Sequence, residues 1–155
     1  MDDIDIVEKK YAEAVQGIKE EWFENANNKW YDYIVELPIQ LRNTYLVVIL
    51  HNQVFNGGFH QYFVNGYGQF AKVTINALIE IGAIQKAELL AEAFDIVNVE
   101  NNAYEVFRNK LLKKEIKALF VRDDLSDSLD KLDSVYYEND VDDINQLLGR
   151  YLLKK

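Results

Sequence analysis

The feature of this sequence that most constrains its fold is an apolar segment in the middle, residues 38–68, interrupted by Asn56-Gly57-Gly58. Before the interruption, apolar residues recur at helical spacing, and residues 45–50 are apolar on every side of the helix. A helix that is apolar all round is typical of a protein core. Glycine adopts left-handed backbone angles without a steric penalty and commonly ends helices. The segment therefore predicts a buried central helix that breaks at Asn56-Gly57-Gly58.

The segments on both sides of this centre also carry helical patterns. One proline and seven glycines among 155 residues leave few positions that break a helix. Apolar residues at spacings of three and four predict further helices over residues 3–24, 69–81, 84–97 and 103–120, then an acidic helix from residue 123 and a last helix from about residue 140. The joints between these segments are short. We therefore expect residues 1–155 to form one compact all-α domain of several helices.

The charge balance restricts the partners that the chain can bind. The sequence holds 17 Lys and Arg residues against 26 Asp and Glu residues, which gives a net charge of −9 at pH 7. Nucleic acid and anionic membranes repel such a chain, so neither is expected as a direct partner. A basic protein is the complementary partner, and we expect the chain to meet it as a monomer or a homodimer.

The lack of cysteine and the acidic first residues restrict the expected chemistry and compartment. Without cysteine, disulfides and thiolate metal sites are excluded. The first residues, Met1-Asp2-Asp3-Ile4-Asp5, are acidic and show no apolar signal region, which favours a cytoplasmic location. The apolar run in the centre is much shorter than the roughly 20 residues that a bilayer requires.

The strongest candidate for a functional surface is the acidic C-terminal third. Residues 123–143 carry acidic side chains throughout, with Lys131 as the one basic residue. Helical spacing places an apolar stripe on one side of this segment, namely Leu125, Leu129, Leu132 and Tyr136. The opposite side carries the candidate protein-binding residues, which are Asp123, Asp127, Asp130 and Glu138. The structural alternative is an ordinary solvated face, with the acidic residues near residue 140 capping the last helix.

One row of carboxylates is sparser than one strand of DNA. Carboxylates four residues apart on a helix have Cβ atoms about 5–6 Å apart, whereas phosphates advance about 3.4 Å along a strand. A surface that imitates a duplex therefore needs rows from several elements. The acidic residues between residues 2 and 24 could supply a second row if the first helix lay beside the acidic helix.

Two other sites are possible on the residues alone. His51 and His60 flank the glycine break and could hold a small ligand or a metal together with a carboxylate, but they show no recognised ligand spacing. Their structural alternative is a pair of hydrogen-bonded histidines at the edge of the core. An aromatic patch around Trp30 could instead serve an interaction or immunity-type regulatory module. The sequence shows no nucleophile beside a base, so we expect no enzyme, no cofactor and no metal.

Several motifs resemble those of a known family. They are Asn56-Gly57-Gly58-Phe59-His60-Gln61-Tyr62-Phe63, the segment from Ala77 to Ala83 followed by Ala87, and the C-terminal pairs Leu132-Asp133, Tyr136-Tyr137, Leu147-Leu148 and Tyr151-Leu152. Over about residues 31–155 the chain is similar to the bacterial DNA-mimic protein family. The resemblance implies an all-helical fold without catalytic residues. For the namesake of the family it implies an acidic surface that occupies the DNA-binding site of a transcription factor. We therefore expect a non-enzymatic protein that regulates transcription by presenting its acidic face to a basic, DNA-binding partner.

Overall fold

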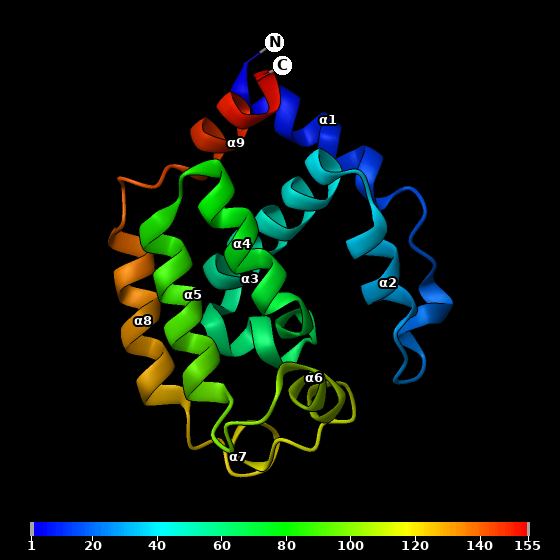
Figure 1. Cartoon of the computed structure of the whole chain (residues 1–155). Helices are drawn as coiled ribbons and strands as arrows, with labels where there is room; N and C mark the ends of the chain where they lie inside the picture. Colours follow the sequence, from blue (N-terminus) through cyan, green and yellow to red (C-terminus); the bar gives the residue numbers. More distant parts are fainter. Residues whose placement is uncertain (1, 155) are drawn as a thin grey trace.

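The broken central helix organises the fold. Helix α3 (Ile39–Val64) crosses the molecule, and its backbone leaves helical angles at Gly57 and Gly58. In the computed structural model, which describes residues 2–154, the other helices pack around it (Figure 1). Leu46, Leu50 and Val54 in its first half are completely buried. The predicted all-α domain with a buried, broken central helix is thereby confirmed.

The remaining elements follow one another through short connections. They are α1 (Asp3–Val15), the 3-10 turn η1 (Glu20–Phe23), α2 (Lys29–Glu36), the 3-10 turn η2 (Tyr67–Phe70), α4 (Ala71–Ile81), α5 (Ile84–Val97), α6 (Tyr104–Leu112), α7 (Lys117–Phe120), α8 (Ser126–Glu138) and α9 (Ile144–Leu153). Helix α1 packs against α3 and α9, α4 packs against α5, and α8 packs against α3 and α5. Figure 1 shows α1 and α9, the first and last helices of the described chain, close together. No helix among residues 2–154 combines the length and the apolarity needed to cross a membrane.

Helix α8 supplies the polar groups that the break in α3 requires. Gly58 has φ of 77°, and a side chain there would collide with the carboxylate of Asp133. That carboxylate accepts a hydrogen bond from the backbone N–H of Phe59 at 2.8 Å, so it caps the second half of α3. The hydroxyl of Tyr137 donates to the backbone oxygen of Val54 at 2.6 Å, one turn before the break. A break in a buried helix frees backbone groups that need partners, and these contacts provide them.

Side-chain amides cover the outer side of the same break. Gln61 donates to Gln53 at 2.9 Å and accepts from Asn56 at 3.1 Å. Its side chain lies over Gly57 so closely that a Cβ there would collide with it. The Asn-Gly-Gly motif and Gln61 therefore have structural roles.

Two helices end earlier than their sequence patterns predict. The helix predicted over residues 3–24 ends at Val15, because the Tyr33 hydroxyl donates to the backbone oxygen of Ala14 at 2.7 Å and accepts from the N–H of Gly17 at 3.2 Å. The helix predicted over residues 103–120 is divided into α6 and α7. Lys114 lies between them with φ of 57° and interrupts the helical path.

The last helix starts later than predicted. Helix α9 begins at Ile144, and Asp143 is its N-cap, accepting from the N–H of Gln146 at 3.0 Å. The predicted start near residue 140 is therefore wrong by about one turn, because the preceding Asp142 is buried and is used elsewhere. Its carboxylate accepts from the backbone N–H of Lys86 at 2.9 Å and so caps the start of α5.

Candidate acidic interface

The outer face of α8 carries most of the predicted site residues. Asp127, Asp130 and Glu138 are exposed on this helix. Leu129 and Tyr136 on the opposite side are buried, as their spacing predicts. The separation of an apolar inner face from a carboxylate-lined outer face is therefore confirmed for α8. The binding role of these carboxylates stays a prediction.

Asp123 does not share this face. It lies before the start of α8, in the connection from α7, with φ of 53°. Its carboxylate accepts from the hydroxyl of Ser126 at 2.8 Å and lies 3.0 Å from Nε2 of His60. The prediction that Asp123 is on the acidic helix is wrong, because the chain turns sharply before Ser126. Its carboxylate is held by groups of its own chain.

Not every acidic residue of this third faces solvent. Asp133 is buried against the break in α3, and this burial raises the pKa of its carboxyl group, while the hydrogen bond from Phe59 works in the opposite direction. Charge counting on the sequence missed this inward role. The signal was present in the spacing, since Asp133 follows Leu129 by four residues and so falls on the apolar stripe.

A buried cation secures the end of α8 to the start of α5. The amino group of Lys86 donates to the backbone oxygens of Asn139 and Asp142 at 3.0 and 2.9 Å, and to the side-chain oxygen of Asn139 at 2.9 Å. It also lies 4.7 Å from the centre of the Tyr136 ring, a cation–π distance. Burial lowers the pKa of this amino group. These contacts make Lys86 an internal anchor, and its charge is directed away from the outer face.

The second acidic row comes from α5. Figure 1 shows α1 on the other side of α3 from α8, so the first helix does not supply that row. Helix α5 packs directly against α8, and Asn139 at the end of α8 donates to Gln85 at the start of α5 at 2.6 Å, so the two helices run antiparallel. Exposed acidic side chains follow α5 at helical spacing, namely Glu88, Glu92 and Asp95.

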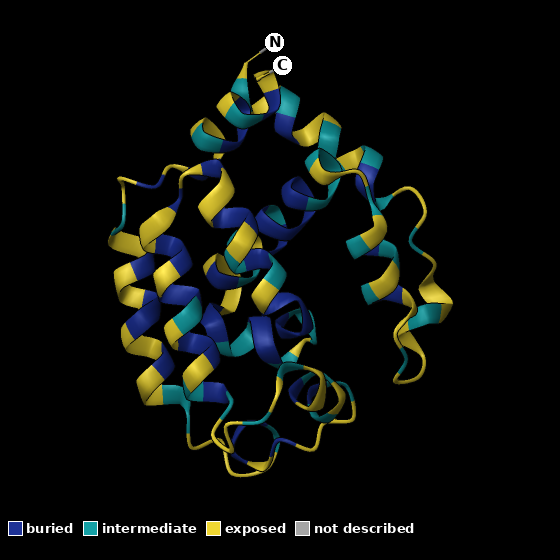
Figure 2. Cartoon of the chain, viewed as in Figure 1, coloured by how far each residue is buried: buried dark blue, intermediate teal, exposed yellow. Residues whose placement is uncertain are grey.

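Both of these neighbouring helices expose acidic side chains. Figure 2 shows the exposed bands of α5 and α8 next to each other on the outside of the molecule. We name this the α5–α8 surface, and its acidic residues are Glu88, Glu92, Asp95, Asp127, Asp130 and Glu138. Within residues 2–154, none of these carboxylates forms an ion pair with a Lys, Arg or His side chain. Lys131 is the exposed basic residue of α8.

The basic segment at α6 does not neutralise this surface. Lys110 pairs with Glu100 at 2.9 Å, in the loop that precedes α6. The guanidinium of Arg108 stacks on the ring of Tyr31 at 3.4 Å from its centre and donates to Asn28 at 2.9 Å. Lys110 and Arg108 of α6 therefore contact the loop before α6 and the start of α2.

The two histidines are held by different groups. Nδ1 of His51 lies 2.9 Å from the hydroxyl of Tyr136, and burial, followed by the nearby charge of Lys86, lowers the pKa of its ring. His60 contacts Asp123, as described above. In the part of the chain that the structure describes, no three His, Asp or Glu side chains are grouped as metal ligands.

Trp30 belongs to the core. Its side chain is buried, its indole N–H donates to the Tyr45 hydroxyl at 3.1 Å, and its ring packs edge-on against Phe70. The aromatic patch predicted around Trp30 therefore presents other side chains to solvent. Phe23, which packs on Trp30, is 53% exposed.

The structure defines an all-helical protein with a net charge of −9 that exposes carboxylates on two neighbouring helices, α5 and α8. The chain belongs to the DMP19-like protein family, whose model matches residues 35–155. The family takes its name from DNA mimic protein 19, so the resemblance to DNA-mimic proteins is confirmed. DNA-mimic proteins are generally non-enzymatic. Comparisons with curated proteins and with solved structures give no match.

Proposed function

We propose that this chain is a non-enzymatic protein that binds a basic, DNA-binding protein through the α5–α8 surface and thereby regulates transcription. The observation that carries the proposal is the presence of exposed carboxylates, without ion pairs among residues 2–154, on two adjacent antiparallel helices. Membership of the DMP19-like family supports the same kind of partner.

The charge density of the surface indicates how closely it imitates DNA. From Asp127 to Glu138, α8 advances about 17 Å at about 1.5 Å per residue. Six carboxylates, three on α5 and three on α8, less the opposing charge of Lys131, give about one net charge per 3 Å over this length. A DNA duplex carries about one charge per 1.7 Å. The surface therefore presents about half the charge density of a duplex, which is enough to attract a basic groove and to make binding depend on salt.

The experiment compares two variants that lose the same charge on different faces. The first is Asp127→Asn with Asp130→Asn and Glu138→Gln. The control is Glu20→Gln with Glu21→Gln and Glu24→Gln, which neutralises exposed residues in and after η1. Both are compared with the unmodified chain as bait in affinity capture, followed by titration of the captured protein with purified bait.

We expect the captured protein to be basic, to be released by added duplex DNA and by salt, and to bind the first variant weakly and the control normally. Equal binding of both variants contradicts the assignment of the α5–α8 surface. A partner that is not basic, or binding that does not change with salt, contradicts the proposed function itself.

The aromatic alternative makes a different prediction. An interaction or immunity-type module would bind through the exposed ring of Phe23, because Trp30 is buried. Phe23→Ala should then abolish capture of the partner while the α8 variant retains it. This result would favour the aromatic patch over the acidic surface.

A further inference from the structure

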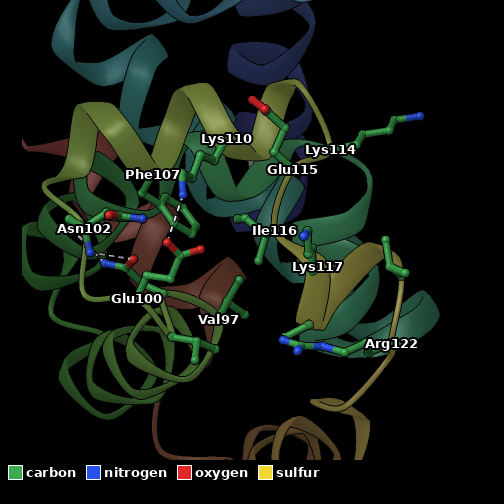
Figure 3. A pocket seen from close by; sticks show the side chains of 14 residues that line it. Val97, Glu100, Asn102, Phe107, Lys110, Lys114, Glu115, Ile116, Lys117 and Arg122 are labelled. Carbon is green, nitrogen blue, oxygen red and sulfur yellow. Dashed lines mark hydrogen bonds and ion pairs between the residues drawn. The ribbon is translucent and has the colours of Figure 1, made fainter.

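A pocket opens on the molecule at a place that the proposed partner does not use. It lies between the end of α5, the loop of residues 98–103, α6 and α7, and its volume is about 510 Å³. This volume is within the range of about 300–1,000 Å³ that is typical of pockets for small ligands. Figure 3 shows that side chains from all of these segments meet there.

The inner lining of the pocket is apolar. Val97, Phe107 and Ile116 are buried side chains that line it. Val99 and Val121 also line it but are 58% and 74% exposed. A ligand with an apolar body would contact the buried side chains and remove the exposed ones from water, which is favourable in proportion to the apolar area covered.

The rim of the pocket carries more basic than acidic side chains, although the chain as a whole has a net charge of −9. Its basic residues are Lys110, Lys114, Lys117 and Arg122, and its acidic residues are Glu100 and Glu115. Lys110 points into the cavity toward Glu100, with which it pairs at 2.9 Å, whereas Lys114 extends away from the cavity (Figure 3). Arg122 pairs with Asp124 through Nε at 3.0 Å. Arg122 therefore still has the donors of its two terminal nitrogens available.

Lys117 is the remaining cation of the rim. Its amino group forms no ion pair with a carboxylate among residues 2–154. Lys117 and Arg122 belong to the same short segment around α7, and both line the pocket. An anionic group placed between them would be matched by charge, while the apolar part of the same molecule would extend toward Phe107.

We propose that this pocket binds a small organic anion, a carboxylate attached to an apolar chain or ring. Lys117 and Arg122 bind the carboxylate, and the buried side chains of Val97, Phe107 and Ile116 contact the apolar part. Glu100 opposes binding, because it neutralises Lys110 and repels the incoming anion. The site is separate from the α5–α8 surface, so it adds a ligand to the proposed protein partner.

The probe for this site is octanoate, and 1-octanol is the matched neutral compound with the same alkyl chain. Octanoate is titrated below its critical micelle concentration and 1-octanol below its solubility limit into the isotopically labelled chain, and backbone amide shifts are recorded by NMR. We expect octanoate to cause saturable shifts confined to residues 97–122, and 1-octanol to bind about tenfold more weakly. The absence of saturable octanoate shifts in this segment would overturn the proposal, as would equal binding of the two compounds.

Two matched variants separate the site from general charge effects. Lys117→Gln with Arg122→Gln should weaken octanoate binding about tenfold, since each exposed ion pair contributes up to about fivefold. Lys9→Gln with Arg150→Gln loses the same charge at exposed positions in α1 and α9 and should bind octanoate normally. Equal weakening by both variants refutes the site.

A variant with higher affinity completes the test. Glu100→Gln releases Lys110 and removes the repulsion, so it should strengthen octanoate binding about threefold. Weaker binding by this variant would contradict the assigned role of Glu100 and with it the proposed electrostatics of the rim. All of these side chains are at least partly exposed, and the amide spectrum of each variant reports whether its fold is retained.

Discussion

The contact between Asp133 and Phe59 allows a direct test of how α8 is attached to the broken central helix. Asp133→Ala leaves the buried N–H of Phe59 without its acceptor, which costs about 1–3 kcal/mol in the free energy of unfolding. Asp133→Asn keeps an oxygen in the same place and nearly the same shape. We expect this variant to lose less than about 1 kcal/mol, because the cap to the second half of α3 remains.

The pH dependence of the free energy of unfolding provides a second, independent test of the role of Asp133. Burial raises the pKa of Asp133 above its ordinary value of 3.8. The folded state therefore holds this proton more tightly than the unfolded state, and ionisation of the carboxyl group destabilises the fold. The contribution of the protonated group is complete below pH 3.8 and is lost as pH rises through the pKa of the folded state. Relative to the wild type, Asp133→Asn should thus gain stability as pH rises through this window.

The measurement is urea-induced unfolding, followed by circular dichroism, at a series of pH values on either side of the window. Asp127→Asn is the control, since it makes the same change at an exposed position of the same helix and should shift the free energy of unfolding by less than about 1 kcal/mol. Equal stability of Asp133→Ala and the wild type would refute the capping role. Equal losses in the free energy of unfolding for Asp133→Ala and Asp133→Asn would show that the acceptor oxygen does not stabilise the fold.

Two further predictions concern the same region. Gly58→Ala should destabilise the fold by about 1–3 kcal/mol more than Gly66→Ala, because both glycines have positive φ but only a side chain at residue 58 would collide with a neighbour; equal losses in urea unfolding would contradict this. Burial lowers the pKa of His51 below its ordinary value of 6.5, so the folded state binds this proton less tightly than the unfolded state, and stability is lost as pH falls through 6.5. His51→Gln should remove this part of the pH dependence, and unfolding profiles of the variant and the wild type that run parallel from about pH 7.5 to 5 would refute the assignment.

The central helix could be predicted because its signals are local. Apolar side chains on every side of residues 45–50 indicate burial, and the two consecutive glycines that follow indicate a break. The inward face of α8 was likewise predictable from helical spacing. These features depend on a few residues that are close together in the chain.

The remaining features depend on contacts between residues far apart in the chain. Helix α1 ends where Tyr33 reaches it, and the pattern of residues 3–24 contains no sign of that contact. The spacing places Asp133 on the apolar stripe of α8, but its capping role becomes clear only from its partner Phe59, 74 residues earlier in the chain. The position of Asp123 follows from a left-handed turn that an aspartate adopts less readily than a glycine.

The contribution of α5 to the α5–α8 surface could not be predicted from the sequence for the same reason. Sequence charge alone directed attention to the C-terminal third and to the first helix. The acidic residues of α5 are interspersed with apolar ones, so the sequence pattern of this segment indicates an ordinary amphipathic helix. Only the packing of α5 against α8 brings the helix that carries Glu88, Glu92 and Asp95 next to the helix that carries the predicted residues.

The attachment of α8 has a consequence for engineering. Asp133 and Tyr137 attach this helix to the backbone of α3, Lys86 anchors its end to α5, and its buried apolar face packs inward. The exposed carboxylates Asp127, Asp130 and Glu138 take no part in these contacts. The outer positions of α8 could therefore be substituted, for example with side chains of opposite charge, while the packing of the helix is retained. The binding properties of this face of α8 could thus be redesigned separately from the fold.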